Sequence, residues 1–174
     1  KTFVLEALYD STFDARTYEY QPVLFNLSKF DEGAEKNTIE VGVGDKVYDP
    51  ALDESVELAV GTVISMNQAE GDPIDVTVEE GKTYPVVQIV TSHTIAAGAT
   101  WEDGTPVTTD DVLFSFEVGA SPDTPSSKYF FETQTQKLEA VDASTYKYFF
   151  MPGYTSGTYF VDGMIQPFPT HVYG

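Results

Sequence analysis

Cysteine is absent from this 174-residue sequence, so disulfides and thiolate chemistry are excluded. Basic residues are also scarce: nine Lys and Arg stand against 28 Asp and Glu, giving a net charge of -19. A nucleic-acid partner needs a basic surface, and an anionic membrane repels an acidic one, so neither partner is expected. Arg16 is the single arginine, which leaves almost nothing for bidentate recognition of carboxylates.

Long hydrophobic runs are missing too. No apolar stretch approaches the ~20 residues of a membrane span. No signal peptide is recognisable at Lys1. We therefore expect that export of this protein would depend on a leader segment outside these residues.

Motifs for catalysis and metal binding are lacking. His93 and His171 are the two histidines, and no H-x-x-x-H pair, EF-hand loop, G-x-S-x-G or phosphate-binding glycine loop accompanies them. We expect structural roles for both histidines. A group of four acidic residues is spaced loosely enough to bind calcium by chance, but these residues are more simply explained as a solvated acidic face. The group consists of Asp49, Asp53, Glu54 and Glu57. The sequence thus predicts no catalytic residue, metal or cofactor.

Hydrophobic residues make up 41% of the chain and aromatic residues 14%, enough for a folded core. Tyr and Phe, which favour half-buried strands, dominate the aromatics. The pattern predicts an α+β protein, with a strand-rich antiparallel sheet and few short helices. We expect strands over 2–9, 38–43, 46–48, 56–60, 62–66, 74–78, 83–91, 137–141 and 145–150. We expect helices over 18–30, 108–119 and 159–165, a polar loop over 31–37 and an irregular tail over 167–174.

Two hairpins follow from the turn residues. The strands 74–78 and 83–91 should pair through the Glu79–Lys82 turn, with Pro85 placing the second strand at an edge near its start. The near-continuous apolar residues after Pro85 predict that this strand is covered on both faces. The strands 137–141 and 145–150 should form the other hairpin.

The most informative segment is 101–116, WEDGTPVTTDDVLFSF. Asp103-Gly104 is a tight-turn pair. Thr108 can cap a helix, with Asp111 three residues later as in a capping box. The helix should bury one face and end at Gly119. The inward residues are expected to be Val112, Leu113, Phe116 and Val118.

This segment reads W-x-D-G-x-P-x-T-x-x-D-V, which resembles the signature of the family 5 extracellular solute-binding proteins, the receptors of ABC importers for peptides, nickel and oligosaccharides. Residues 137–147 resemble the family's next hairpin, and Pro169–Tyr173 resembles its "P-K-H-x-Y" segment. The family's basic pair before the signature is replaced here by Ala96-Ala97. In the family the signature is a scaffold, so a structural role is expected for Trp101, Asp103, Gly104, Pro106, Thr108, Asp111 and Val112.

The resemblance implies a lobe fragment of a type II-like periplasmic binding protein. Residues 1–174 would form a single domain or lobe fragment, with 1–37 as a first-lobe-like strand and helix and 38–174 as the smaller accessory domain. The implied function is the non-enzymatic, monomeric substrate-binding component of an ABC importer. It would capture oligopeptides or similar small solutes outside the cytoplasmic membrane, as a periplasmic protein or cell-surface lipoprotein, and deliver them to a membrane permease.

Ligand contacts, if present in this part, are expected at Tyr9, Tyr18 and Tyr20, because tyrosine offers a rigid apolar ring with a polar tip. Packing of these rings in the core is the competing interpretation. The alternative function is a free-standing carbohydrate-binding or adhesion module, and a hydrolase with paired carboxylates is the least favoured reading.

Overall fold

The computed structural model describes residues 34–125, 129–155 and 163–174. The expected strand 2–9 and helix 18–30 lie outside these ranges. Within them, no helix combines the length and the apolar character needed to cross a bilayer.

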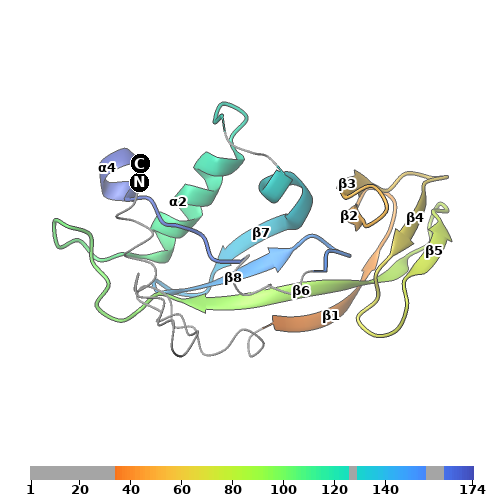
Figure 1. Ribbon diagram of the computed structural model, residues 1–174, viewed down its shortest axis with the longest axis horizontal. Helices are drawn as coiled ribbons and strands as arrows, with labels where there is room; N and C mark the ends of the chain where they lie inside the picture. Colours follow the sequence, from red (N-terminus) through yellow and green to blue (C-terminus); the bar gives the residue numbers. More distant parts are fainter. Residues whose placement is uncertain (1–33, 126–128, 156–162) are drawn as a thin grey trace, which may run out of the picture.

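A four-stranded antiparallel sheet organises the chain, with the strand order β1-β6-β8-β7 (Figure 1). Its strands are β1 (Ala34–Val41), β6 (Tyr84–Thr94), β8 (Thr145–Phe150) and β7 (Thr135–Ala140). The β7–β8 hairpin is the one predicted from sequence. β6 is buried at every position from Val86 to Thr91, so its predicted coverage on both faces is confirmed. The strand-rich antiparallel class is likewise confirmed.

Two small hairpins extend from one end of the long strand β6 (Figure 1). One joins β2 (Lys46–Asp49) to β3 (Glu54–Glu57), and the other joins β4 (Val63–Met66) to β5 (Ile74–Thr77). They share a second apolar core with the ends of β1 and β6. Its buried members are Val41, Val47, Leu58, Ile64, Met66, Val78 and Val86.

The predicted pairing of residues 74–78 with 83–91 is wrong, because β5 pairs with β4 instead. Both edges of β6 are already used near its start. One edge pairs with β1. On the other, Val87 N–H donates to the Asn67 carbonyl at 2.9 Å, and its own carbonyl accepts from Gly153 N–H at 2.7 Å. Pairing between distant segments therefore overrides the local turn.

The prediction of a polar loop over 31–37 is also wrong for residues 34–37. Residues from Ala34 onward belong to β1, where Ala34 pairs with Thr91 and Asn37 with Gln88 of β6. This register extends the strand beyond the alternating apolar residues that marked it in the sequence.

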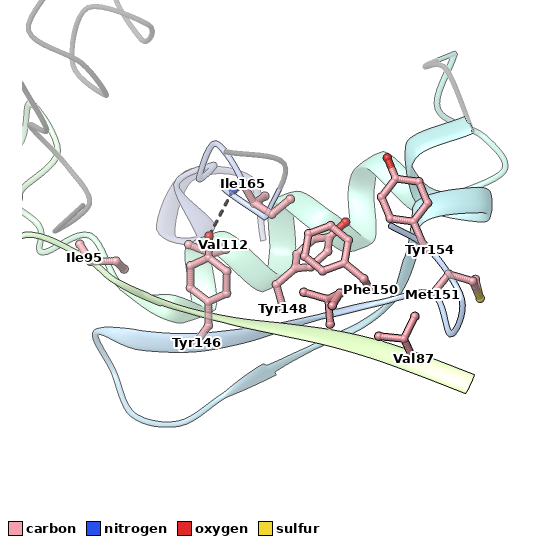
Figure 2. Close-up of a cluster of buried hydrophobic side chains, with 10 residues drawn as sticks. Val87, Ile95, Val112, Tyr146, Tyr148, Phe150, Met151, Tyr154 and Ile165 are labelled. Atoms are coloured by element: carbon pink, nitrogen blue, oxygen red, sulfur yellow. Dashed lines mark hydrogen bonds between the residues drawn. The ribbon is translucent and has the colours of Figure 1, made fainter. Parts of the chain in front are cut away.

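Helix α2 (Thr109–Ala120) covers one face of the sheet (Figure 1). Figure 2 shows Val112 of this helix pointing toward Tyr146 and Ile165, in the core beneath it. Tyr146, Tyr148 and Phe150 alternate along β8 and are each 0% exposed. The inward face of the signature helix thus completes the main core.

Gly119 does not end the helix, which continues to Ala120 and is capped by Ser121. A Cβ at Gly119 would lie 2.2 Å from Cζ of Phe131. The glycine is therefore required by the close approach of an aromatic ring, not by a change of backbone direction.

Two short elements near the end of the chain were not predicted. A π-helical turn (Phe130–Gln134) leads into β7, and helix α4 (Thr170–Tyr173) replaces part of the tail expected to be irregular. The expected helix 159–165 falls mostly outside the described residues, and its last three positions, 163–165, are not helical.

Candidate functional site

The signature segment begins with a closed turn ahead of α2. Trp101 N–H donates to the Thr105 carbonyl at 2.7 Å, and Gly104 N–H donates to the Trp101 carbonyl at 2.9 Å. The Asp103 carboxylate accepts from Thr105 N–H at 2.9 Å. Gly104 has a φ of 86°, which glycine adopts without strain. The predicted Asp-Gly turn is confirmed.

Asp111 is the polar centre of this region. It is 2% exposed, yet its two carboxylate oxygens accept four hydrogen bonds. Oδ2 accepts from Thr108 N–H at 3.0 Å and from Trp101 Nε1–H at 3.1 Å. Oδ1 accepts from the backbone N–H and the hydroxyl of Thr170, at 2.9 and 2.7 Å. The bond from Thr108 is the Asp111 half of the predicted capping box.

Burial alone would raise the pKa of Asp111, because the charged form loses hydration. The hydrogen bonds from Thr170, Thr108 and Trp101 outweigh this effect and place the pKa below its ordinary value. Asp111 is therefore ionised at neutral pH, as a carboxylate that binds four donors requires.

The segment that starts near Gln166 closes over this carboxylate. Phe168 N–H donates to the Asp111 carbonyl at 3.2 Å, and Ser115 Oγ donates to the Gln166 carbonyl at 2.5 Å. His171 Nε2 lies 2.8 Å from Oδ2 of Asp103. Two segments that are distant in the sequence therefore form one unit.

We call this unit the Asp111 joint. Its polar members are Trp101, Asp103, Thr108, Asp111, Thr170 and His171. Pro106 closes the turn through a bridge to Thr100, and Val112 anchors the joint in the core. The exposed Asp103 carboxylate has a lowered pKa, caused first by its bonds from Thr105 and then by His171.

A shallow groove of about 540 Å³ borders the joint. Ala96-Ala97, Val107 and Ser144 are among its lining residues. The alanine pair occupies the positions where the family signature has basic residues, so this groove presents small side chains and backbone.

His93 lies in the core, 0% exposed, with its ring stacked on Tyr146 at 5.0 Å between centroids. Its Nε2 shares a hydrogen bond of 2.8 Å with the Thr91 hydroxyl. Burial lowers the pKa of His93 to about 3, so the ring is neutral. Both histidines have structural surroundings, since His171 belongs to the Asp111 joint.

A second pocket of about 550 Å³ lies between the β2–β3 hairpin and the π-helical turn. At its edge, the phenols of Tyr48 and Tyr129 both donate to Asp53 Oδ1, at 2.9 and 2.5 Å. Sequence reasoning treated Asp53 only as part of an acidic face, since Tyr129 is 76 residues away. Among the described residues, no group of three or more His, Cys, Asp or Glu side chains is arranged to hold a metal ion.

The tyrosines expected near a ligand, Tyr9, Tyr18 and Tyr20, lie outside the described residues, and their role stays a prediction. Asp49, of the same predicted acidic face as Asp53, is 6% exposed and accepts a hydrogen bond from Ala51 N–H at 2.8 Å. Asp49 is therefore a buried residue at the end of β2, and not part of a solvated acidic face.

Comparison with known proteins bears on the region of the joint. Residues 91–169 match the model of the bacterial extracellular solute-binding proteins, family 5 middle. A "Probable ABC transporter-binding protein" of Deinococcus radiodurans is 27% identical over 119 residues, covering 67% of this chain and 20% of the relative. The chain thus spans about a fifth of the length of that relative.

Two solved structures are similar at 20% identity and a TM-score of 0.40, each over 76% of this chain. One is an oligopeptide binding protein from Thermus thermophilus complexed with a pentapeptide, of which 20% is covered. The other is a putative peptide binding protein AppA from Clostridium difficile, of which 24% is covered. The signature motif thus lies within residues 91–169, which are similar to the middle segment of the bacterial extracellular solute-binding proteins of family 5, the family that the motif resembles.

Proposed function

We propose that this chain is part of the substrate-binding component of an ABC importer, which captures oligopeptides or similar small solutes outside the cytoplasmic membrane. The observation that carries the proposal is the family match over residues 91–169, which contains Asp111 and its donors Trp101 and Thr108 and ends one residue before Thr170. Because the chain spans about a fifth of its relative's length, the proposal concerns a longer receptor to which these residues belong.

The proposed mechanism is lobe closure without catalysis. A solute that binds the closed form more tightly than the open form shifts the population toward closure, and a membrane permease then recognises the closed receptor. In this mechanism the Asp111 joint keeps α2, the signature turn and α4 rigid with respect to the sheet. The receptor would act as a monomer, either periplasmic or anchored as a lipoprotein.

The roles that we propose for the two parts of the chain are those that the family resemblance implies. Residues 38–174 would form the smaller accessory domain, and 1–37 would belong to the first lobe. Tyr9, Tyr18 and Tyr20 would then lie near the cleft and contact the solute, while the joint would not. On this arrangement the isolated 174-residue chain lacks most of the binding surface.

Calorimetry with a mixed oligopeptide library tests the proposal on two proteins, the complete receptor and the 174-residue chain. We expect binding with a dissociation constant of about 1 µM or tighter for the receptor and no comparable binding for the chain alone. A receptor that binds no peptide or other small transported solute, but binds immobilised glycans, would overturn the proposal in favour of a carbohydrate-binding module. Micromolar peptide binding by the isolated chain would contradict these proposed roles.

A further inference from the structure

Three tight turns of the small hairpin region are built alike. They connect β1 to β2, β3 to β4 and β5 to β6, and they span Gly42–Asp45, Ala59–Thr62 and Glu79–Lys82. In each turn the fourth residue's N–H donates to the carbonyl of the first, at 3.1, 2.9 and 3.3 Å. The third residue of each is a glycine with a φ of 93°, 89° or 73°, as a type II turn requires. The residue ahead of each turn is buried in the second apolar core: Val41, Leu58 and Val78.

Hydrogen bonds join the three turns into one surface. Gly44 N–H donates to the carbonyl of Leu58, the residue ahead of the second turn, and Leu58 N–H donates to the Asp45 carbonyl, both at 2.8 Å. The same pair of 2.8 Å bonds joins the second turn to Val78, the residue ahead of the third turn. The third turn lies against the first, because a Cβ added to Gly42 would be 3.2 Å from the carbonyl oxygen that ends the third turn. We call this surface the three-turn tip.

The three-turn tip exposes valine side chains that the fold does not require. Val43 and Val60, the second residues of the first two turns, are 51% and 61% exposed, and Val63, directly after the second turn, is 73% exposed. The third turn has Glu80 at its second position and Thr83 directly after it. Because the three turns share one backbone geometry, polar residues are compatible with these positions. Exposed apolar side chains that gather without a role in the fold mark a contact surface.

The border of the tip is acidic. Two lysines, Lys46 and Lys82, lie within two residues of a turn, and Lys82 is paired with a glutamate of its own turn at 2.6 Å. Five exposed carboxylates lie within the same distance along the chain: Glu40, Asp45, Glu57, Glu79 and Glu80. The border therefore has a net negative charge, in a chain whose total is -19. A second copy of the chain or another acidic protein would be repelled, whereas a basic border on a partner would be attracted.

From these observations we infer that the three-turn tip docks a protein partner whose contact face is apolar and bordered by lysine or arginine. The valines supply the dry centre of such an interface and the carboxylates its polar rim. The tip lies ahead of residues 91–169, which match the family, so the inference is independent of the proposed receptor function.

The test is an amide-resolved NMR titration of the 174-residue chain with three model peptides. The first is a short amphipathic helical peptide of leucine and lysine, the second has glutamate in place of lysine, and the third has serine in place of leucine. We expect the leucine–lysine peptide to give saturable shifts at residues 42–46, 59–63 and 79–83, with a dissociation constant of about 100 µM or tighter. The glutamate peptide should be repelled. The serine peptide, which keeps only the charge, should give no saturable shifts confined to the tip.

A matched pair of variants separates the tip from general stickiness. Val43→Thr with Val60→Thr replaces two exposed methyl groups by hydroxyls and keeps the side-chain shape. Val141→Thr with Val172→Thr makes the same change at positions outside the tip, which are 57% and 58% exposed. We expect the tip variant to weaken binding of the leucine–lysine peptide about tenfold, and the control variant to change it less than about twofold.

Each remaining outcome overturns the inference. Equal binding of the glutamate or serine peptide would remove the charge or the valines from the explanation. Equal weakening in the two variants, or shifts that do not saturate up to about 1 mM, would show that the tip is no docking surface. Shifts at the tip with phosphatidylcholine vesicles but not with the leucine–lysine peptide would assign it to a lipid surface instead. None of these results bears on whether the complete receptor captures peptides, which calorimetry decides separately.

Discussion

Asp111→Asn removes the negative charge at the centre of the joint with little change of shape. The carboxylate now accepts four hydrogen bonds, two on each oxygen. An asparagine side chain has one acceptor oxygen and one NH₂ group. Whichever way the amide is turned, its NH₂ must face two donors, either those of Thr170 or those of Thr108 and Trp101.

The size of the effect follows from those lost bonds. A hydrogen bond to a charged group contributes about 1.5–3 kcal/mol, and two are lost. Part of this loss is offset because a neutral amide costs less to bury than a carboxylate. We therefore expect the free energy of unfolding to fall by about 3 kcal/mol, a decrease of ~6–12 °C in melting temperature for a chain of this size.

The loss should depend on pH in a defined direction. The pKa of Asp111 in the folded protein lies below its ordinary value of 3.8. A carboxyl with a depressed folded pKa stabilises the protein above its unfolded pKa, and this contribution disappears as the pH falls through the folded pKa. The stability gap between the wild type and Asp111→Asn should thus be constant near neutrality and shrink in acid below about pH 3.8.

Urea unfolding monitored by tryptophan fluorescence measures both effects, because Trp101 is the single tryptophan and belongs to the joint. Asp110→Asn is the matched control. It removes the same charge from the first turn of α2, but Asp110 is exposed. Its cost should stay well under 1 kcal/mol. Equal losses for the two variants, or a gap that widens in acid, would refute the account of the joint.

The remaining predictions concern Gly119, His93 and Trp101. Gly119→Ala should destabilise the protein by about 1–3 kcal/mol, because the new methyl group meets the Phe131 ring; adding Phe131→Leu should recover most of this loss in the same urea assay. His93 has a pKa of about 3 when folded and 6.5 when free, so stability should fall as the pH decreases below about 6.5, by up to about 1.4 kcal/mol per pH unit. Calorimetric melting of His93→Gln should show a flatter profile over that range, and an unchanged slope would contradict the assignment. Trp101→Phe removes one donor to Asp111 and should cost about 1 kcal/mol by thermal melting, with no loss at all arguing against the bond.

Local signals predicted the parts of the fold in which neighbours in sequence are neighbours in space. The Asp103-Gly104 turn, the start of α2 at Thr109 and the β7–β8 hairpin all depend on residues within a few positions of one another. Turn chemistry and helix capping act over this short range, so the sequence carries them directly.

The predictions that were wrong concern contacts between residues that are distant in the sequence. β5 pairs with β4 and not β6, because Asn67 and Gly153 occupy an edge of β6. The sequence predicted that Gly119 ends the helix. The actual reason for a glycine there is the ring of Phe131, which lies outside the helix and whose approach is not visible in the local sequence. Such contacts come from tertiary packing, which overrides local preference.

In the candidate sites, too, short-range features were predicted from the sequence and long-range contacts were not. Asp111 was recognised as a helix-capping residue, but its bonds from Thr170, 59 positions later, were not foreseeable from spacing. The pocket at Asp53 was missed for the same reason, because Tyr129 and Thr133 reach it from a distant segment. A single sequence gives the chemistry of these residues, while only the fold brings them together.

The most direct test of the central claim is the peptide affinity of the complete receptor carrying Asp111→Asn, measured by calorimetry well below its melting temperature. If the joint is a scaffold within a peptide receptor, the variant should melt earlier than the wild type and still bind peptide within about twofold of its affinity. A loss of affinity of about tenfold or more without a fall in melting temperature would place Asp111 in contact with the ligand and contradict the account.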